Sequence, residues 1–504
     1  IRYVTFIFSV WYIPNGEYKG KYKNAILMVF QIVTKSTTFV AIIENRQMTS
    51  KTILETIGNT PMVELTHTDT GVCRLFMKLE NQNPGGSIKD RVGLSMINEA
   101  EKQGRIQPGD TIVEATAGNT GLGLALVSRL KGYNLVLVIP DKMSQEKINH
   151  LRALGVEIIL TRSDVSKGHP EYYQDYAKRI ADERGGFYVN QFENVSNPLA
   201  HETTTAPEIW EQMEHQVDAI VVGVGSSGTI TGLTRFFKQT SPTTEFILAD
   251  PKGSILADYI NKGVLRTDAG SWFVEGIGED FVPSIADFSL TKKAYTVSDK
   301  ESFDAVRDLL RNEGILAGSS SGTLLGAAIR YCREQTTLKR VVTIACDSGN
   351  KYLSKMYNDY WLLDHGFAER EQYGDLRDFI SHRFEDKSIV YVTPNDTLKA
   401  VYGKFKLYDI SQLPVLEGSK VVGIIDESDL LLALYSKNHT LDTPVKEIMT
   451  KELTTISYTT HQDKLVRILN AGLVAIVEDS QGHFEGLITK IDFINHLHRN
   501  RTNC

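Results

Sequence analysis

Short runs of apolar, often β-branched residues alternate with amphipathic stretches from about residue 52 to residue 361. Examples of the apolar runs are "DTIVEAT", "NLVLVIP", "DAIVVGV" and "RVVTIACD", and two of the intervening stretches are "GLGLALVSRLKG" and "QEKINHLRALG". Near-continuous apolar strands that alternate with helices are typical of parallel sheets covered on both faces. We therefore predict an α/β fold with parallel sheets for this region.

The last third of the chain has a different pattern, in which one unit occurs twice. "LPVLEGSKVVGIIDESDLLLAL" is followed by the looser copy "AIVEDSQGHFEGLITKIDFINHL". Gly423 corresponds to Gly486 and Asp429 to Asp492, at one constant offset. Each copy ends as strand, turn and helix, which predicts two related α/β modules. The alternative is a coincidence between two unrelated hairpin-and-helix stretches.

These patterns divide the chain into four segments. We predict an N-terminal extension of doubtful structure at 1–47, an α/β domain at 48–362, a charged linker at 363–377 and a repeat domain at 378–504. The apolar runs of the extension are shorter than the ~20 residues of a membrane span, and no A-x-A cleavage site follows. We expect no membrane role, and Met48 is a more natural first residue.

The composition of the chain mainly excludes classes of function. Hydrophobic residues make up 41% and charged residues 23% of the chain, which is ordinary for a soluble globular protein. The net charge is -7 and no basic block occurs, so a nucleic-acid partner is not expected. The four cysteines lie far apart and form no CxxC pair, which argues against a zinc site or a disulfide framework. A reducing cytoplasm fits this cysteine usage best.

Three small-residue turns lie at predicted helix starts. "GVGSSG" follows a strand with G-x-G-x-x-G spacing, so its backbone amides would bind a phosphate, either of NAD or of another cofactor. "EATAGNTGLGLA" would bind a carboxylate in the same way, unless it is only a tight strand-to-helix turn. "AGSSSGT" places serine hydroxyls at a helix start, where a simple N-cap is the alternative.

A lysine follows the two glycines of "NPGGSIKDR". Lys89 could be a solvated charge at a helix start, a phosphate contact or a lysine that forms a covalent bond. A phosphate site, a carboxylate site and an available lysine together suit a pyridoxal phosphate enzyme, because a lysine amine forms a Schiff base with the cofactor aldehyde. NAD alone would leave Lys89 and the serine turn unexplained.

Six motifs in order resemble a known family. "GNTPMVEL", "NPGGSIKDR", "EATAGNTGLGLA", "GSSGTITG", "VEGIGEDFVP" and "AGSSSGT" closely resemble the fold-type II pyridoxal phosphate enzymes of the cysteine synthase and cystathionine β-synthase group. The resemblance covers about residues 52–362, and the C-terminal repeats resemble a tandem pair of CBS modules. The pair favours the cystathionine β-synthase branch, as does Glu275, where cysteine synthases commonly carry Gln.

The resemblance implies a role for individual residues of these motifs. Lys89 would be the catalytic lysine that binds the cofactor covalently, and Ser320 would face the pyridine nitrogen. A hydroxyl there leaves the nitrogen unprotonated, which favours loss of a β-substituent. The remaining cofactor contacts would be Asn119 at the 3′-oxygen and Gly225, Ser226, Ser227, Gly228 and Thr229 at the phosphate. The substrate would be bound by Thr116, Gly118, Asn119, Thr120, Gln191 and Gly278.

The implied activity is replacement of the β-substituent of L-serine, or of an activated serine, by L-homocysteine to give L-cystathionine. An alternative enzyme of the same group makes cysteine from O-acetylserine and sulfide. A different class of protein, a ligand sensor with an inert catalytic fold, is a third possibility that intact Lys89 and Ser320 argue against. We expect a homodimer or a higher homo-oligomer.

Several positions depart from the family pattern. Ala117 stands where the substrate loop often has Ser, and Phe192 and Glu279 stand where some members have Tyr. These differences affect the expected amino-acid preference rather than the cofactor. Haem-bearing members have an N-terminal Cys and His as ligands, and no such pair precedes Thr52 here, so we predict no haem and no metal.

The repeats suggest a regulatory site. In CBS modules a Thr or Ser three residues before an Asp commonly contacts a ribose and a phosphate, and Thr489 and Asp492 have this spacing. In the first repeat Asp426 replaces the hydroxyl and would repel a phosphate. We therefore expect at most one nucleoside site and prefer S-adenosylmethionine over ATP. The alternative is a module pair that only dimerises the enzyme.

Overall fold

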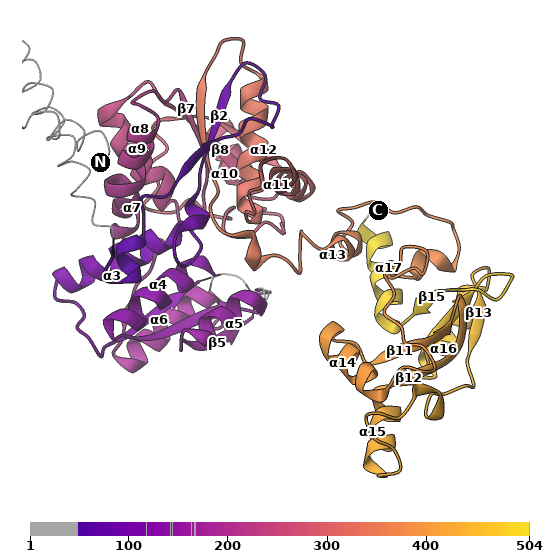
Figure 1. Ribbon diagram of the computed structural model, residues 1–504. Helices are drawn as coiled ribbons and strands as arrows, with labels where there is room; N and C mark the ends of the chain where they lie inside the picture. Colours follow the sequence, from indigo (N-terminus) through magenta and orange to yellow (C-terminus); the bar gives the residue numbers. More distant parts are fainter. Residues whose placement is uncertain are drawn as a thin grey trace, which may run out of the picture. The chain divides into compact units, whose positions relative to one another are not determined.

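The computed structural model describes residues 49–502, except 117, 142, 144, 163, 166 and 167. The extension predicted for 1–47, with Met48 after it, lies outside the described residues. The chain divides into two units, Ile1–Gly58 and Asn59–Cys504. In the first unit the described part contains a short 3-10 helix, η2 (Ile53–Thr56). All other described elements belong to the second unit (Figure 1).

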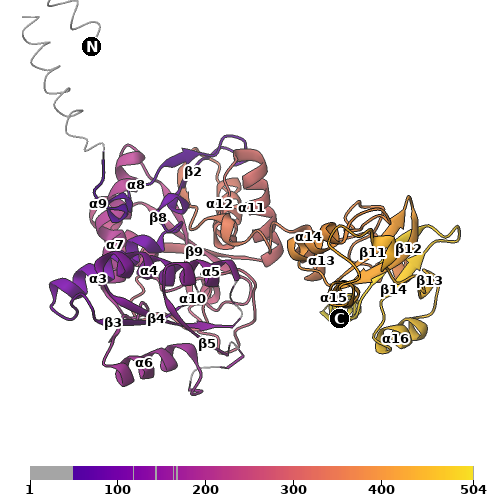
Figure 2. The ribbon, with the colours of Figure 1, turned by 60° about the horizontal axis from the view of Figure 1, so that its bottom comes forward.

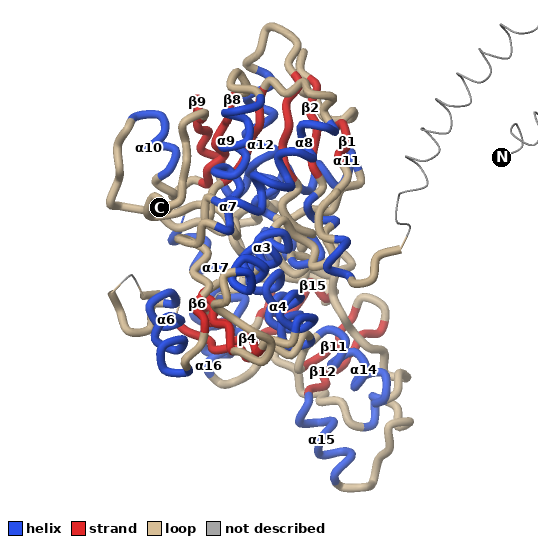
Figure 3. Tube along the Cα trace, turned by 90° about the vertical axis from the view of Figure 1, so that its left-hand side faces the viewer, coloured by secondary structure: helices blue, strands red, loops and turns tan. Residues whose placement is uncertain are grey.

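A six-stranded sheet forms the larger half of the α/β region. Its strand order is β1-β2-β10-β7-β8-β9, and every neighbouring pair is parallel except β1 with β2. Figure 3 shows β8 and β9 side by side at one edge. The central strands are buried along their length because helices cover both faces, which explains their continuous apolar sequences. The strands are β1 (Met62–Glu64), β2 (Arg74–Lys78), β7 (Ala219–Gly223), β8 (Glu245–Pro251), β9 (Thr291–Val297) and β10 (Arg340–Ile344).

A second, four-stranded sheet is entirely parallel and has the order β5-β4-β3-β6. Helix α6 packs on β3 and β4 from one side, and α4 packs on β4 from the other. Figure 2 shows this three-layer arrangement. The prediction of parallel sheets with helices on both faces is confirmed, and the antiparallel edge strand β1 is the departure from it. The strands are β3 (Thr111–Ala115), β4 (Asn134–Pro140), β5 (Glu157–Thr161) and β6 (Phe187–Tyr188).

Several helices of the α/β region end where a glycine adopts positive φ, as at Gly132, Gly185 and Gly314. One continuous helical run, α7–η4–α8, contains a π-helical turn at η4. The longer helices are α3 (Lys89–Lys102), α4 (Asn119–Lys131), α5 (Gln145–Ala153), α6 (Tyr173–Arg184), α9 (Gly228–Thr240), α11 (Asp299–Glu313) and α12 (Ser319–Arg333). The shorter ones are η3 (Glu80–Gln82), α7 (Ser196–Ala200), η4 (His201–Thr205), α8 (Ala206–Gln212), α10 (Leu256–Lys262), η5 (Gly349–Lys351) and α13 (Asp359–Asp364).

The predicted repeat is confirmed as two similar modules. In each one an antiparallel strand pair leads into a helix, β11–β12–α15 in the first and β14–β15–α17 in the second. Separate buried clusters form the two cores. The first module contains α14 (Leu398–Tyr408), β11 (Gln412–Glu417), β12 (Lys420–Asp426) and α15 (Glu427–Tyr435). The second contains η6 (Leu376–Phe379), β13 (Thr455–Ser457), α16 (Gln462–Asn470), β14 (Ala475–Glu478), β15 (Phe484–Ile488) and α17 (Lys490–Thr502), and η7 (Val445–Glu447) lies between the modules in sequence.

In the part of the chain that the structure describes, every helix is too short or too polar to cross a membrane.

Candidate active site

The turn between β7 and α9 has the geometry of a phosphate site. Ser227 has φ of 64°, and a side chain at Gly225 would collide with the carbonyl oxygen of Gly276, so the backbone is tightly wound just before the helix. The Ser227 hydroxyl is buried and has no hydrogen-bond partner among the described residues. An unpaired buried hydroxyl beside the free amides of a helix start matches the acceptor oxygens of a phosphate.

Lys89 is the first residue of α3, and close helix packing positions it. A Cβ at Gly93 would lie 2.6 Å from the carbonyl carbon of Gly123, and one at Gly123 would lie 2.5 Å from the carbonyl oxygen of Lys89. Helices α3 and α4 therefore cross with their backbones in contact, which brings the starts of both helices to one cavity. Burial lowers the pKa of Lys89, although the nearby Cys346, Asp347 and Glu279 act in the opposite direction.

The start of α4 brings the predicted substrate residues together. Thr120 donates a hydrogen bond of 2.7 Å to Oε1 of Gln191, which comes from the segment after β6. The Asn119 amide donates to Oδ2 of Asp347 over 2.8 Å and accepts from Nζ of Lys351 over 2.9 Å. Asn119 is thus held from the other sheet, by residues that follow β10.

The three serines at the start of α12 have different environments. Ser319 accepts a hydrogen bond from the backbone N–H of Glu275 over 3.0 Å, and Ser321 accepts one from the N–H of Cys346 over 2.9 Å. Ser320 instead lines the cavity. The geometry therefore favours Ser320 over its neighbours as the hydroxyl that meets the ring nitrogen.

A single cavity of about 640 Å³ collects these elements between the two sheets. Its size suits a small cofactor with an amino-acid substrate. Phe192 and Glu279 also line it, and Ala117 lies outside the described residues. The cavity is lined by every predicted catalytic, cofactor and substrate residue of the α/β region: Lys89, Thr116, Gly118, Asn119, Thr120, Gln191, Gly225, Ser226, Ser227, Gly228, Thr229, Gly278 and Ser320. The individual roles stay predictions.

The two residues predicted for a nucleoside site lie at the start of α17. Thr489 donates through its hydroxyl to Oδ2 of Asp492 over 2.5 Å and through its backbone N–H over 2.7 Å. Ser381 also donates to the Asp492 carboxylate. In the first module Asp426 and Asp429 form a capping box at α15. The residue pairs at the starts of α15 and α17 thus serve as helix caps. A nucleoside contact at Thr489 and Asp492 stays a prediction.

A charged cluster at the cavity was missed from sequence. Glu275 accepts hydrogen bonds from Nζ of Lys147 at 2.5 Å and from Nζ of Lys355 at 2.6 Å. Lys147 also donates to the Tyr352 hydroxyl over 3.2 Å, and this hydroxyl donates to Asp347 over 2.7 Å. From the sequence, Glu275 only distinguishes branches of the family. The spacing of these residues gave no signal because they come from three distant segments.

The cavity defines the class of protein. A turn suited to a phosphate, a partly buried lysine, a hydroxyl at the start of α12 and a turn suited to a carboxylate lie around one space. Together they fit pyridoxal phosphate and have the arrangement of a fold-type II enzyme that uses this cofactor. A family model described as "Pyridoxal-phosphate dependent enzyme" matches residues 53–347, and one described as "CBS domain" matches residues 380–436 and 445–499.

Two similar proteins show which family of pyridoxal phosphate enzymes the chain belongs to. The chain is 36% identical over 447 residues to the cystathionine beta-synthase of Oryctolagus cuniculus, covering 86% of this chain and 80% of that protein. It is 35% identical over 460 residues to the cystathionine beta-synthase of Dictyostelium discoideum, covering 88% and 92%. The protein therefore belongs to the cystathionine β-synthase family of pyridoxal phosphate-dependent enzymes.

Two solved structures share the α/β region. A hydrogen sulfide-producing enzyme from Fusobacterium nucleatum is 35% identical with a TM-score of 0.56, covering 60% of this chain and 100% of that one. An O-ureido-L-serine synthase is 32% identical with a TM-score of 0.58, covering 64% and 98%. The catalytic fold is thus shared with proteins that carry other names, over 60–64% of this chain.

Proposed function

We propose that this protein joins L-serine to L-homocysteine to form L-cystathionine and water. The single observation that carries the proposal is the convergence of Lys89 and three helix-start turns on one cavity, in a chain that also carries tandem CBS modules. The C–O bond at serine Cβ breaks, and a C–S bond to the homocysteine sulfur forms. When bound, pyridoxal phosphate supplies an aldehyde that takes an amine and a ring that withdraws electrons.

The chain's own residues bind, orient and move protons. The amides at the start of α4 and the Thr120–Gln191 pair bind the serine carboxylate. Burial lowers the pKa of Lys89, so a larger fraction of its amine is neutral and able to take the Cα proton. The Ser320 hydroxyl donates toward the ring nitrogen and leaves it unprotonated. The walls of the cavity restrict water around these groups.

A second candidate function is synthesis of cysteine from O-acetylserine and sulfide. The likeness of the α/β region to the O-ureido-L-serine synthase and the hydrogen sulfide-producing enzyme favours it, because all three share one catalytic fold. An inert sensor is disfavoured because Lys89 lines the cavity and has a lowered pKa.

One set of incubations separates these functions. Purified protein is given L-serine or O-acetylserine, each with homocysteine or with sulfide, and the products are identified by mass spectrometry. Cystathionine as the fastest product from serine and homocysteine supports the main proposal, and cysteine as the fastest product from O-acetylserine and sulfide contradicts it. A colourless protein that forms neither product, even with added cofactor, would instead support the inert ligand sensor.

The finer assignments belong to the same proposal. The segment at 1–47 is an extension, the α/β domain occupies 48–362, and 363–377 links it to the repeat domain at 378–504. The modules bind an adenosyl ligand at Thr489 and Asp492. The protein works in the cytoplasm, in keeping with its widely spaced cysteines, as a homodimer or higher homo-oligomer without haem.

A further inference from the structure

One helical run touches both the phosphate turn and the helix that carries Lys89. This run, α7–η4–α8, packs on α9 so closely that a Cβ at Gly232 would lie 2.7 Å from Cβ of His201. A side chain at Gly228 would overlap the side chain of Asn197. Both glycines lie in α9, Gly228 within the phosphate turn (residues 225–229) and Gly232 just after it. The run therefore forms the wall behind that turn.

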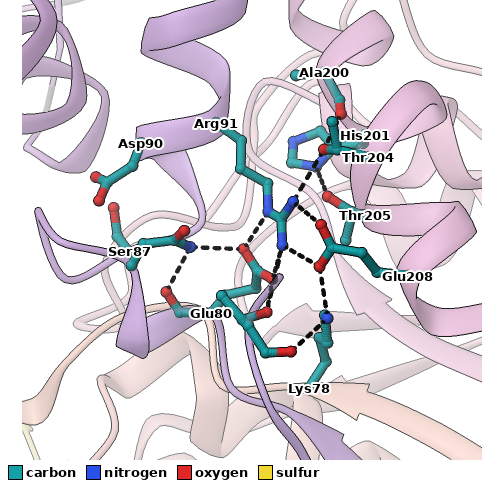
Figure 4. Close-up of polar contacts among 12 residues, drawn as sticks. Lys78, Glu80, Ser87, Asp90, Arg91, Ala200, His201, Thr204, Thr205 and Glu208 are labelled. Atoms are coloured by element: carbon teal, nitrogen blue, oxygen red, sulfur yellow. Dashed lines mark hydrogen bonds and ion pairs between the residues drawn. The ribbon is translucent and has the colours of Figure 1, made fainter. Parts of the chain in front are cut away.

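Two side chains of the run reach the turn itself. Asn197 donates to Oγ of Ser226 over 2.9 Å. His201 lies one turn further along, and its Nε2 is 3.3 Å from Oγ1 of Thr229. Its Nδ1 is 3.0 Å from Oγ1 of Thr205, the last residue of the π-helical turn. Figure 4 shows His201 next to Thr205, and both residues are fully buried. π-helical turns of this kind are frequent at functional sites.

A neighbouring face of the same run contacts α3. The Arg91 guanidinium donates to Oγ1 of Thr204 over 3.0 Å and to both carboxylate oxygens of Glu208 over 2.7 Å (Figure 4). Arg91 is two residues from Lys89. One element thus supports the residues predicted at the two ends of the cofactor, the phosphate turn through His201 and the lysine helix through Thr204 and Glu208.

The hydrogen-bond directions around His201 follow from its protonation. Burial, with added repulsion from Lys89 and Arg91, lowers the pKa of His201 well below its ordinary value, so the imidazole is neutral. A neutral imidazole has one donor and one acceptor nitrogen. If Nε2 accepted from Thr229, the threonine would turn only lone pairs toward a phosphate, which repels them. The favourable arrangement has Thr205 donating to Nδ1 and Nε2–H donating to Thr229.

We propose that His201 is a positioning residue that orients the Thr229 hydroxyl, so that this hydroxyl donates its hydrogen to the cofactor phosphate. The inference rests on the proposed assignment of residues 225–229 to that phosphate. His201 does not touch the reacting atoms. Its contribution is a fixed donor direction on the cavity side of Thr229, established before the cofactor arrives.

Two substitutions distinguish the contribution of Nε2 of His201 from that of Nδ1. In His201→Gln the side-chain amide reaches about as far as Nε2 and keeps a donor for Thr229. In His201→Asn the shorter amide replaces Nδ1 and keeps only the contact with Thr205. The measurement is the Kd of the cofactor-free protein for pyridoxal phosphate, and in parallel for pyridoxal, which lacks the phosphate. The phosphorus NMR shift of bound pyridoxal phosphate is recorded for each variant.

We expect His201→Asn to weaken pyridoxal phosphate binding roughly tenfold to hundredfold, as for loss of one charge-assisted hydrogen bond. His201→Gln should restore most of the affinity, the phosphorus shift should change only in His201→Asn, and pyridoxal binding should be the same in all forms. Equal losses for Asn and Gln, or a parallel loss for pyridoxal, would overturn the proposal in favour of packing alone. A wild-type protein that binds both compounds equally would instead refute the phosphate assignment.

Thr205→Val tests the same proposal and leaves the imidazole of His201 in place. It removes the donor to Nδ1, so the tautomer with Nε2–H is no longer favoured. Pyridoxal phosphate binding should weaken by at least about threefold, since part of a hydrogen bond is lost. Pyridoxal binding should not change. Unchanged affinity for pyridoxal phosphate in a folded Thr205→Val protein contradicts the proposal even if neither His201 variant folds.

Discussion

Replacing Arg91 with Ala should destabilise the α/β region far more than removing an ordinary surface ion pair. Arg91 donates to both oxygens of Glu80, over 2.8 Å each, and to both oxygens of Glu208, over 2.7 Å each. The side chains of Arg91 and Glu80 are 2% and 0% exposed. Burial alone would raise the pKa of Glu208, but the hydrogen bonds and charges of Arg91 and Lys78 outweigh it and lower the pKa to about 2. The Glu208 carboxylate is therefore ionised at neutral pH.

The magnitude follows from what remains after the change. Without the guanidinium, Glu80 is a buried carboxylate that keeps only neutral donors, Thr60 at 2.6 Å and Asn83 at 2.8 Å. Breaking a buried ion pair in this way costs about 3–5 kcal/mol. The matched control is Arg74→Ala, which removes an ion pair with Glu64 whose side chains are 48% and 31% exposed. Exposed pairs contribute about 0.2–1 kcal/mol.

Tryptophan fluorescence during urea unfolding measures the difference. The four tryptophans are Trp11, Trp210, Trp272 and Trp361, so none lies in the repeat domain. Trp210 is on α8, two residues after Glu208. The shift in urea midpoint, multiplied by the slope of the transition, gives the change in free energy. All proteins are compared at one saturating cofactor concentration, because bound ligand adds stability. Equal midpoint shifts for Arg91→Ala and Arg74→Ala would refute the burial argument.

Four further predictions concern the sites and the bound groups. Lys89→Ala should lower kcat by roughly 10²–10⁴-fold in a folded protein, since it removes the base, and borohydride reduction of the wild type with peptide mapping should find the pyridoxyl adduct on Lys89 alone. Ser320→Asp should lower kcat by at least about tenfold because the ring nitrogen becomes protonated, whereas a larger effect of Ser319→Asp would show that the neighbouring serine faces the ring. Calorimetry should detect binding of S-adenosylmethionine but not of ATP, and Asp492→Ala should abolish the heat of binding. If no nucleoside gives heat, the modules have only a structural role. A Soret band that survives dialysis of the purified protein would contradict the expected absence of haem.

The local elements were accessible from sequence because their signals are local. The runs that became β3, β4, β7, β8 and β10 are continuous and apolar, and buried parallel strands have this pattern wherever they occur. The glycines and serines around Lys89, Asn119 and Ser320 are close in sequence to the helices that they begin. Motif order was enough to associate these turns with one cofactor. The strands β1, β6 and β9 gave weaker patterns and were not anticipated.

The long-range arrangement could not be obtained in this way. Strand order places β10 between β2 and β7, although these strands are far apart along the chain, and this order brings Asp347 and Lys351 to Asn119. The backbone contact between α3 and α4 depends on which helix faces Gly93 and Gly123, and a period of 3.6 residues does not specify the partner.

The sequence by itself determined the elements, the repeat and the chemistry available at each turn, because propensity, periodicity and glycine conformation act over a few residues. Only the tertiary structure decided which charges and polar groups are paired. No sequence pattern pointed to Glu208 or His201, or to the partners of Arg91. Their importance comes from their contacts, those of Arg91 with Glu208 and those of His201 with Thr205 and Thr229. The cost of burying a charge or an imidazole depends on its surroundings in three dimensions, and those surroundings are assembled from segments that have no common sequence pattern.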